Sequence, residues 1–163
     1  MLSLGGMLDA RDFFESVRAA AMEEERTRRQ IERMRLREGI RGGGFSSCPG
    51  GGRKDVNGMA ATDSRIDYET MMGERLRSDR ETIDRGMMLL YGLDGDGGVS
   101  KLLGSAVADA VAMRYVQCQS WAAVGDMCCA SASTVKRWCD TAMDTIDSHG
   151  IDRLLCGTGV AEG

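Results

Sequence analysis

The sequence predicts an all-α fold, and three features of its composition indicate this. Ala, Met, Leu, Arg and Glu, which favour helices, are abundant among the 163 residues, whereas β-branched residues are sparse. Pro49 is the single proline of the chain. No run alternates apolar and polar residues for long enough to predict a sheet. We therefore expect a long N-terminal helical hairpin or coiled coil, followed by a C-terminal helix-turn-helix bundle.

Residues 9–38 are predicted to form the first helix. Apolar or small residues recur at helical spacing, at Phe13, Val17, Ala20, Thr27, Ile31 and Met34. Glutamates at 23–25 precede a series of arginines, so opposite charges lie three or four residues apart and support the helix. Seven arginines between residues 26 and 41 could contact a phosphate backbone, but the interleaved acids favour a solvent-exposed helix face.

Residues 39–58 contain eight glycines, two serines and the proline, a composition typical of a flexible linker. A second long helix is predicted over residues 59–90, with inward positions spaced as in the first. These positions are Met59, Ile66, Thr70, Leu76, Ile83, Met87 and Leu90. The two helices could pair within one chain or between chains, and they define a predicted domain over residues 9–93. The glycine-rich segment 92–98 predicts a turn. A calcium loop is not expected there, because the glycine and glutamate that such a loop needs at fixed positions are absent.

Residues 94–150 are predicted to form a second domain. A helix over 101–117 places Leu102, Leu103, Ala106, Val107, Ala110, Val111 and Tyr115 on one face. A short helix over 121–128 and a longer one over 132–148 follow, with Ser120 and Ser131 as their N-caps. Val124 and Val135 are among the residues expected to point inward. Gly150 would end the longer helix, and residues 151–163 are expected to form a flexible tail.

The two helices after residue 120, joined by a turn at 129–131, are typical of a helix-turn-helix, which presents its second helix to a DNA major groove. The exposed N-terminal part of that helix would carry the DNA contacts. The candidate DNA-binding residues are Ser131, Ser133, Thr134, Lys136 and Arg137. Arg and Lys can bind guanine or phosphate, and the hydroxyls would serve phosphates.

The segment RYVQCQSWAAVGDMCCASASTVKRW, with Ala142 beyond it, resembles region 4 of bacterial sigma factors and its phage relatives. Positions that match the family pattern are Arg114, Tyr115, Ser120, Trp121, Val124, Gly125, Ser131, Val135 and Ala142. Over residues 9–149 the chain resembles the RinA/ArpU-type transcriptional regulators of phages. This resemblance implies a phage or prophage activator of late genes that binds double-stranded promoter DNA together with host RNA polymerase.

Two departures from the family pattern affect this interpretation. Cys129 stands where the turn usually has glycine, and Ala132 and Ser133 stand where sigma factors often carry charged base-readers. Charge raises a further point, because residues 94–163 contain nine acidic and five basic side chains. Nonspecific DNA affinity depends on Lys and Arg, so a partner such as polymerase or a second copy is expected to assist. A homo-oligomer formed through the N-terminal helices is one such arrangement.

Two other functions remain open at this stage. A DNA-packaging protein of the small-terminase kind also combines a helix-turn-helix with a coiled coil. Alternatively, the acidic C-terminal part could bind RNA polymerase without reading DNA.

Several kinds of site and location are not predicted. The cysteines and His149 lack the paired spacing of a zinc site, so no cofactor or metal is expected. No nucleophile and base can be paired, so we do not expect an enzyme. Cys128 and Cys129 would need an environment that lowers a thiol pKa to act as a redox switch. No apolar run is long enough to span a membrane, and no secretory signal is seen, so a cytoplasmic location in a bacterial host is expected.

Overall fold

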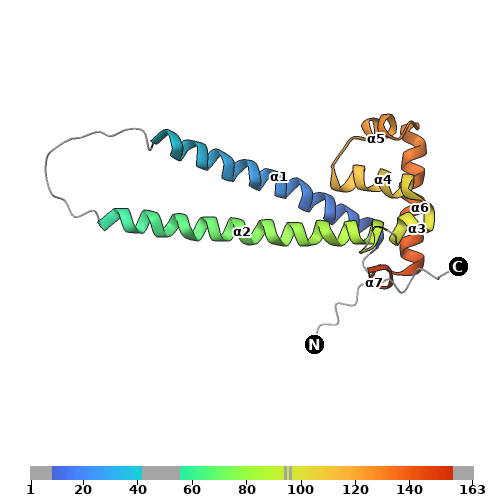
Figure 1. The fold of residues 1–163 in the computed structure, drawn as a ribbon, viewed down its shortest axis with the longest axis horizontal. Helices are drawn as coiled ribbons and strands as arrows, with labels where there is room; N and C mark the ends of the chain where they lie inside the picture. Colours follow the sequence, from blue (N-terminus) through green and yellow to red (C-terminus); the bar gives the residue numbers. More distant parts are fainter. Residues whose placement is uncertain (1–8, 42–55, 94, 96, 156–163) are drawn as a thin grey trace. The chain divides into compact units, whose positions relative to one another are not determined.

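The computed structural model describes residues 9–41, 56–93, 95 and 97–155, and every regular element in these ranges is helical. This confirms the predicted all-α class. Two long helices, α1 (Ala10–Arg41) and α2 (Val56–Tyr91), come first (Figure 1). The shorter elements are α3 (Gly98–Leu103), α4 (Ser105–Val111), the π-helical turn η1 (Ala112–Val116), α5 (Trp121–Met127), α6 (Ala132–His149) and α7 (Ile151–Leu155).

The linker predicted at residues 39–58 is wrong at both of its ends. Helix α1 continues to Arg41 and α2 begins at Val56, so residues 39–41 and 56–58 are helical. The central part of the predicted linker, residues 42–55, lies outside the described residues.

The chain divides into two compact units. The first comprises Met1–Met22 and Asp79–Gly163, and the second comprises Glu23–Ser78. Both boundaries between the units fall inside the long helices, not at the border between residues 93 and 94 that the sequence suggested. Each unit is described by itself below.

The first unit is built around one apolar core. Phe14 and Val17 of α1 pack with Leu89 and Leu90 of α2, and all four are fully buried. Gly86 makes this possible, because a Cβ at that position would lie only 3.0 Å from Val17 Cγ2. Residues from the shorter helices complete the core, and they include Val99, Val111, Val124, Val135, Ala142, Met143 and Ile146.

The single helix predicted over residues 101–117 is wrong. The run is broken at Gly104, which has a φ of 94°, a left-handed conformation that favours glycine. The break changes the helix phase, so Ala106 is exposed and Ala108 is fully buried instead. After α4 the backbone widens into η1, where the Gln117 amide donates to the Ala112 carbonyl over 3.0 Å.

The flexible tail predicted at residues 151–163 is also wrong over its first part. Helix α6 ends at Gly150, as predicted, but α7 follows directly. Leu154 of α7 is only 3% exposed and belongs to the core, which explains why this segment is ordered. Residues 156–163 lie outside the described residues.

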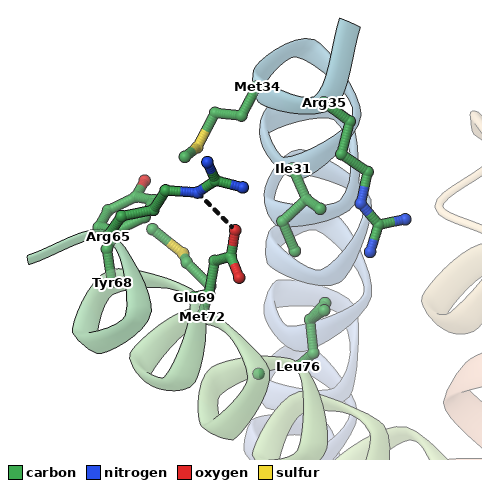
Figure 2. A pocket seen from close by; sticks show the side chains of 9 residues that line it. Ile31, Met34, Arg35, Arg65, Tyr68, Glu69, Met72 and Leu76 are labelled. Atoms are coloured by element: carbon green, nitrogen blue, oxygen red, sulfur yellow. Dashed lines mark hydrogen bonds and ion pairs between the residues drawn. The ribbon is translucent and has the colours of Figure 1, made fainter. Parts of the chain in front are cut away.

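The second unit consists of the adjoining parts of α1 and α2. Gln30 of α1 donates a hydrogen bond to the Tyr68 hydroxyl of α2, so the two helices contact one another within the chain. A groove of about 430 Å³ lies between them, with Ile31, Met34, Met72 and Leu76 among its lining residues. Figure 2 shows Arg65 paired with Glu69 beside this groove.

The predicted inward face of α1 is confirmed, whereas that of α2 is partly wrong. Thr27 is buried and Ile31 and Met34 are half-buried, as the spacing predicted. On α2, Ile66 and Thr70 are exposed, and Tyr68 and Met72 face inward in their place. The reason is that α2 carries apolar residues on more than one side, so spacing alone does not select the buried side.

Candidate nucleic-acid interface

Helix α5 begins at a serine cap, as predicted. The Ser120 hydroxyl accepts a hydrogen bond from the Ala123 amide over 3.2 Å. Trp121 is half-buried and Val124 is fully buried, so the helix is anchored to the core along one side. The exposed residues Ala122, Asp126 and Met127 lie on its other side.

The turn between α5 and α6 spans residues 128–131 and brings the two helices into close contact. A Cβ on Gly125 would lie 2.8 Å from the Ala130 carbonyl oxygen, so only glycine fits at this crossing. The Ala130 amide donates to the Gly125 carbonyl over 2.9 Å. Cys129 has a φ of 50°, so it adopts the left-handed conformation despite its side chain.

Helix α6 is capped by Ser131, as predicted, and the cap uses one of the candidate DNA-binding hydroxyls. Ser131 Oγ accepts from the Thr134 amide over 3.1 Å. It also lies 2.9 Å from Ser133 Oγ and 2.8 Å from Thr134 Oγ1. The three hydroxyls therefore form one exposed or half-exposed cluster at the start of the helix. Ser131 thus caps the helix backbone, and the hydroxyls of Ser133 and Thr134 both hydrogen-bond to the Ser131 hydroxyl.

The predicted cations are both on the solvent side of the first turns of α6. Lys136 and Arg137 are exposed, while Val135 beside them is fully buried. Asp140 follows within four residues, a spacing at which a carboxylate commonly pairs with a helix cation. Among the described residues, however, neither Lys136 nor Arg137 forms an ion pair with it.

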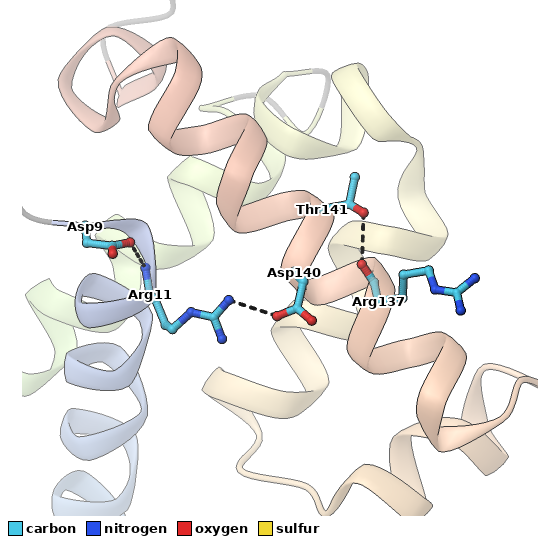
Figure 3. A network of polar contacts seen from close by, with 5 residues as sticks. All are labelled: Asp9, Arg11, Arg137, Asp140 and Thr141. Atoms are coloured by element: carbon cyan, nitrogen blue, oxygen red, sulfur yellow. Dashed lines mark hydrogen bonds and ion pairs between the residues drawn. The ribbon is translucent and has the colours of Figure 1, made fainter.

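Asp140 is paired with α1 instead. Its carboxylate lies 2.9 Å from the Arg11 guanidinium, and the hydrogen bond between them raises the pKa of Arg11. Figure 3 shows the Arg137 side chain pointing away from Asp140. Asp140 is thus neutralised from another helix, so the positive charges of Lys136 and Arg137 stay available to a ligand.

Arg114 is a third cation near α6. From the sequence it was named only as a position that matches the family pattern, and not as a DNA-binding residue. It extends from η1, donates from Nη1 to the Gln119 carbonyl over 2.8 Å, and stacks 4.4 Å from the Trp121 ring centroid. Lys136 Nζ lies 5.7 Å from the same centroid. The sequence showed an aromatic residue, Trp121, directly after a serine cap. Spacing alone could not show that two cations meet at its ring.

Neither Cys128 nor Cys139 lies in an environment that activates a thiol. Burial raises the pKa of Cys128, and burial together with Asp140 raises that of Cys139 to about 12. A raised pKa disfavours the thiolate that redox chemistry requires.

No metal-binding group of three or more His, Cys, Asp or Glu side chains occurs in the part of the chain that the structure describes. None of the described helices combines the length and apolar character that crossing a bilayer requires.

Comparison of the chain with models of known protein families, with curated proteins and with solved structures finds no match.

Proposed function

We propose that this protein is a DNA-binding transcriptional regulator whose α5, turn and α6 act as a helix-turn-helix, with α6 in the major groove. The observation that carries the proposal is the pair Lys136 and Arg137, exposed one turn after a capped helix start and free of the nearby carboxylate. Exposed cations at the N-terminal part of a second helix are the groups that contact bases and phosphates in such motifs. The resemblance to sigma region 4 supports the same assignment.

The expected partners follow from that resemblance. A phage or prophage regulator of late genes would act on promoter DNA beside bacterial RNA polymerase, in the cytoplasm of the host. Support for a partner comes from charge, because nine acidic and five basic residues in 94–163 leave little cationic surface for unaided binding.

The test is selection of binding sites from a library of randomised duplexes, using the full chain. We expect wild type to enrich a common sequence, and Lys136→Ala and Arg137→Ala to lose that enrichment while keeping the helical circular dichroism of wild type. Lys101→Ala is the matched control, because Lys101 is an exposed cation of α3 in the same unit. Failure of wild type to enrich any sequence, with or without polymerase, contradicts the proposal.

A second candidate function rests on the acids of the first unit. Asp126, Asp144 and Asp152 are exposed, and no ion pair is formed by any of them among the described residues. Such a surface could bind a basic patch of RNA polymerase without DNA readout. Capture of polymerase by wild type in the absence of DNA, together with no footprint on any promoter, would favour this function.

We also propose that a second copy of the chain packs against the exposed apolar side chains of the second unit. Only Thr27 and Met72 are buried among its described side chains, while Leu36 and Ile66 are 63% and 55% exposed. Both helices carry interleaved charges of opposite sign, which suits a self-complementary, two-fold pairing. Light scattering should show a dimer for wild type and a monomer for Leu36→Gln combined with Ile66→Gln. A closed ring of many subunits would instead favour the DNA-packaging alternative.

A further inference from the structure

Three separate elements converge on the ring of Trp121. Arg114 from η1 has its guanidinium carbon 4.4 Å from the ring centroid, and Lys136 from α6 has its ammonium nitrogen 5.7 Å from it. Trp121 itself is the first residue of α5 and is half-buried against the core. Both distances are within the range of a cation–π interaction, so the indole attracts both cations.

The two positive charges have no acidic partner in the described ranges of the chain. Neither Arg114 nor Lys136 forms an ion pair with any residue that the structure describes. Arg114 is fixed by its bond to the Gln119 carbonyl and by stacking, and its Nε is buried with no hydrogen-bond partner. Two like charges near one ring repel each other, so an anion that contacts both would relieve this repulsion.

We propose that Arg114 and Lys136 together bind the phosphate backbone of duplex DNA, with Trp121 as the positioning residue that holds both cations. This inference rests on the proposed function and extends it. It adds a cation that lies 22 residues before Lys136 in the sequence, and thereby increases the positive charge next to α6. A guanidinium is suited to this role because its planar face can stack on an indole while its edge donates to phosphate oxygens.

The salt dependence of binding tests this proposal, because each phosphate contact contributes to the slope of log Kd against log salt. We would measure fluorescence anisotropy of a labelled mixed-sequence duplex with the full chain over a series of KCl concentrations. For Arg114→Gln we expect a slope smaller by about 0.9 and an affinity roughly tenfold weaker, the equivalent of about 1.4 kcal/mol. Arg114→Lys should keep most of the slope, because it keeps the charge.

Lys101→Gln is the matched control, since it removes one exposed cation of the same unit and should leave slope and affinity near those of wild type. Trp121→Phe should bind more tightly than Trp121→Leu, because only Phe preserves a stacking ring. A purely structural role of Arg114 would lower the melting temperature of Arg114→Gln but leave the slope unchanged at a temperature where the variant is folded. That result overturns the proposal.

The inference and the proposed function fail in different ways. Absence of salt-dependent binding by wild type, both alone and with RNA polymerase, would count against the function itself. Binding that is lost in Arg137→Ala but unchanged in folded Arg114→Gln would count against the inference alone. If Arg114→Gln does not fold, Trp121 emission in a Trp138→Phe background gives a second measurement, and an emission that duplex DNA leaves unchanged overturns the proposal.

Discussion

The carboxylate of Asp140 on α6 is neutralised by Arg11 of α1, 129 residues earlier in the chain, over 2.9 Å (Figure 3). The pair is exposed, with side-chain exposures of 56% for Asp140 and 55% for Arg11, so it contributes little to folding. Its consequence is electrostatic, because it prevents Asp140 from pairing with Lys136 or Arg137. One helix of the core thereby controls the charge of the candidate DNA-binding surface.

Removal of this pair should affect DNA binding more than stability. We expect Arg11→Gln to change the free energy of unfolding by less than about 1 kcal/mol, and to weaken DNA binding because Asp140 is released near the cations. The double variant Arg11→Gln with Asp140→Asn should recover wild-type affinity. Anisotropy titrations and urea unfolding measure the two effects. An affinity that stays at the wild-type value in Arg11→Gln would show that Asp140 does not influence the site.

Asp147 fixes the start of α1 by capping it from α6. The Ala10 amide donates to Asp147 Oδ1 over 2.8 Å, and a carboxylate at a helix N-terminus also benefits from the helix dipole. We expect Asp147→Ala to lower the free energy of unfolding by roughly 1 kcal/mol, the usual cost of losing a cap. Asp144→Ala is the control, since Asp144 is exposed on the same helix. Equal urea midpoints for the two variants would contradict this role.

The crossing of α5 and α6 depends on the absence of a side chain at Gly125. A methyl group there would meet the Ala130 carbonyl oxygen and the Ala132 amide, at 2.8 and 3.3 Å, and these backbone atoms cannot easily move. We expect Gly125→Ala to destabilise the fold by about 1–3 kcal/mol. Gly73→Ala, where no atom lies within 4 Å, should stabilise by about 0.5–1 kcal/mol, since alanine favours a helix. Thermal unfolding should shift in opposite directions for the two variants.

Cys129 introduces strain into the turn that glycine would remove. Its φ of 50° is unfavourable for a residue with a Cβ by about 1–2 kcal/mol. Its side chain is exposed, so the substitution loses no core contact. Glycine also has the larger unfolded-state entropy, and the net expectation for Cys129→Gly is a stabilisation on the order of 0.5 kcal/mol. Cys129→Ala is the control, and it should show no such gain in the urea midpoint.

The features that the sequence predicted correctly are local. The serine caps at 120 and 131 and the end of α6 at Gly150 depend on residues within a few positions of one another. Such signals act through the adjoining backbone, so they can be recognised from the chain alone. The cations of α6 are exposed for the same reason, because their places relative to Val135 follow from the helical repeat.

The features that could not be predicted depend on contacts between distant segments. From the sequence, Gly104 could have been a glycine inside one helix or the point at which two helices separate. Only the packing of α3 and α4 decides between these structures. The pairing of Arg11 with Asp140, and the meeting of Arg114 and Lys136 at Trp121, require the fold to be known. These contacts alter the candidate site, because they determine which of its charges are neutralised.

Alkaline pH should destabilise the first unit, because the Cys139 thiol and the Tyr115 hydroxyl are buried in it. Burial raises the pKa of Cys139 from 9.0 to about 12, and burial also raises the pKa of Tyr115 above its ordinary 10.0. The folded state therefore holds these protons more tightly than the unfolded state does. Their stabilising effect is complete below about pH 9, where the unfolded thiol is still protonated, and is lost as pH rises toward the folded value.

We expect the free energy of unfolding to fall steadily between about pH 9 and pH 12 in urea titrations. Cys139→Ala should fall less steeply over this interval, because one of the linked protons is absent. The comparison variant is Cys129→Ala, which removes an exposed thiol in place of the buried one. A Cys139→Ala variant with the full wild-type dependence would mean that this thiol is not the linked group, and that other groups with a raised pKa, such as Tyr115 and Cys128, cause the effect.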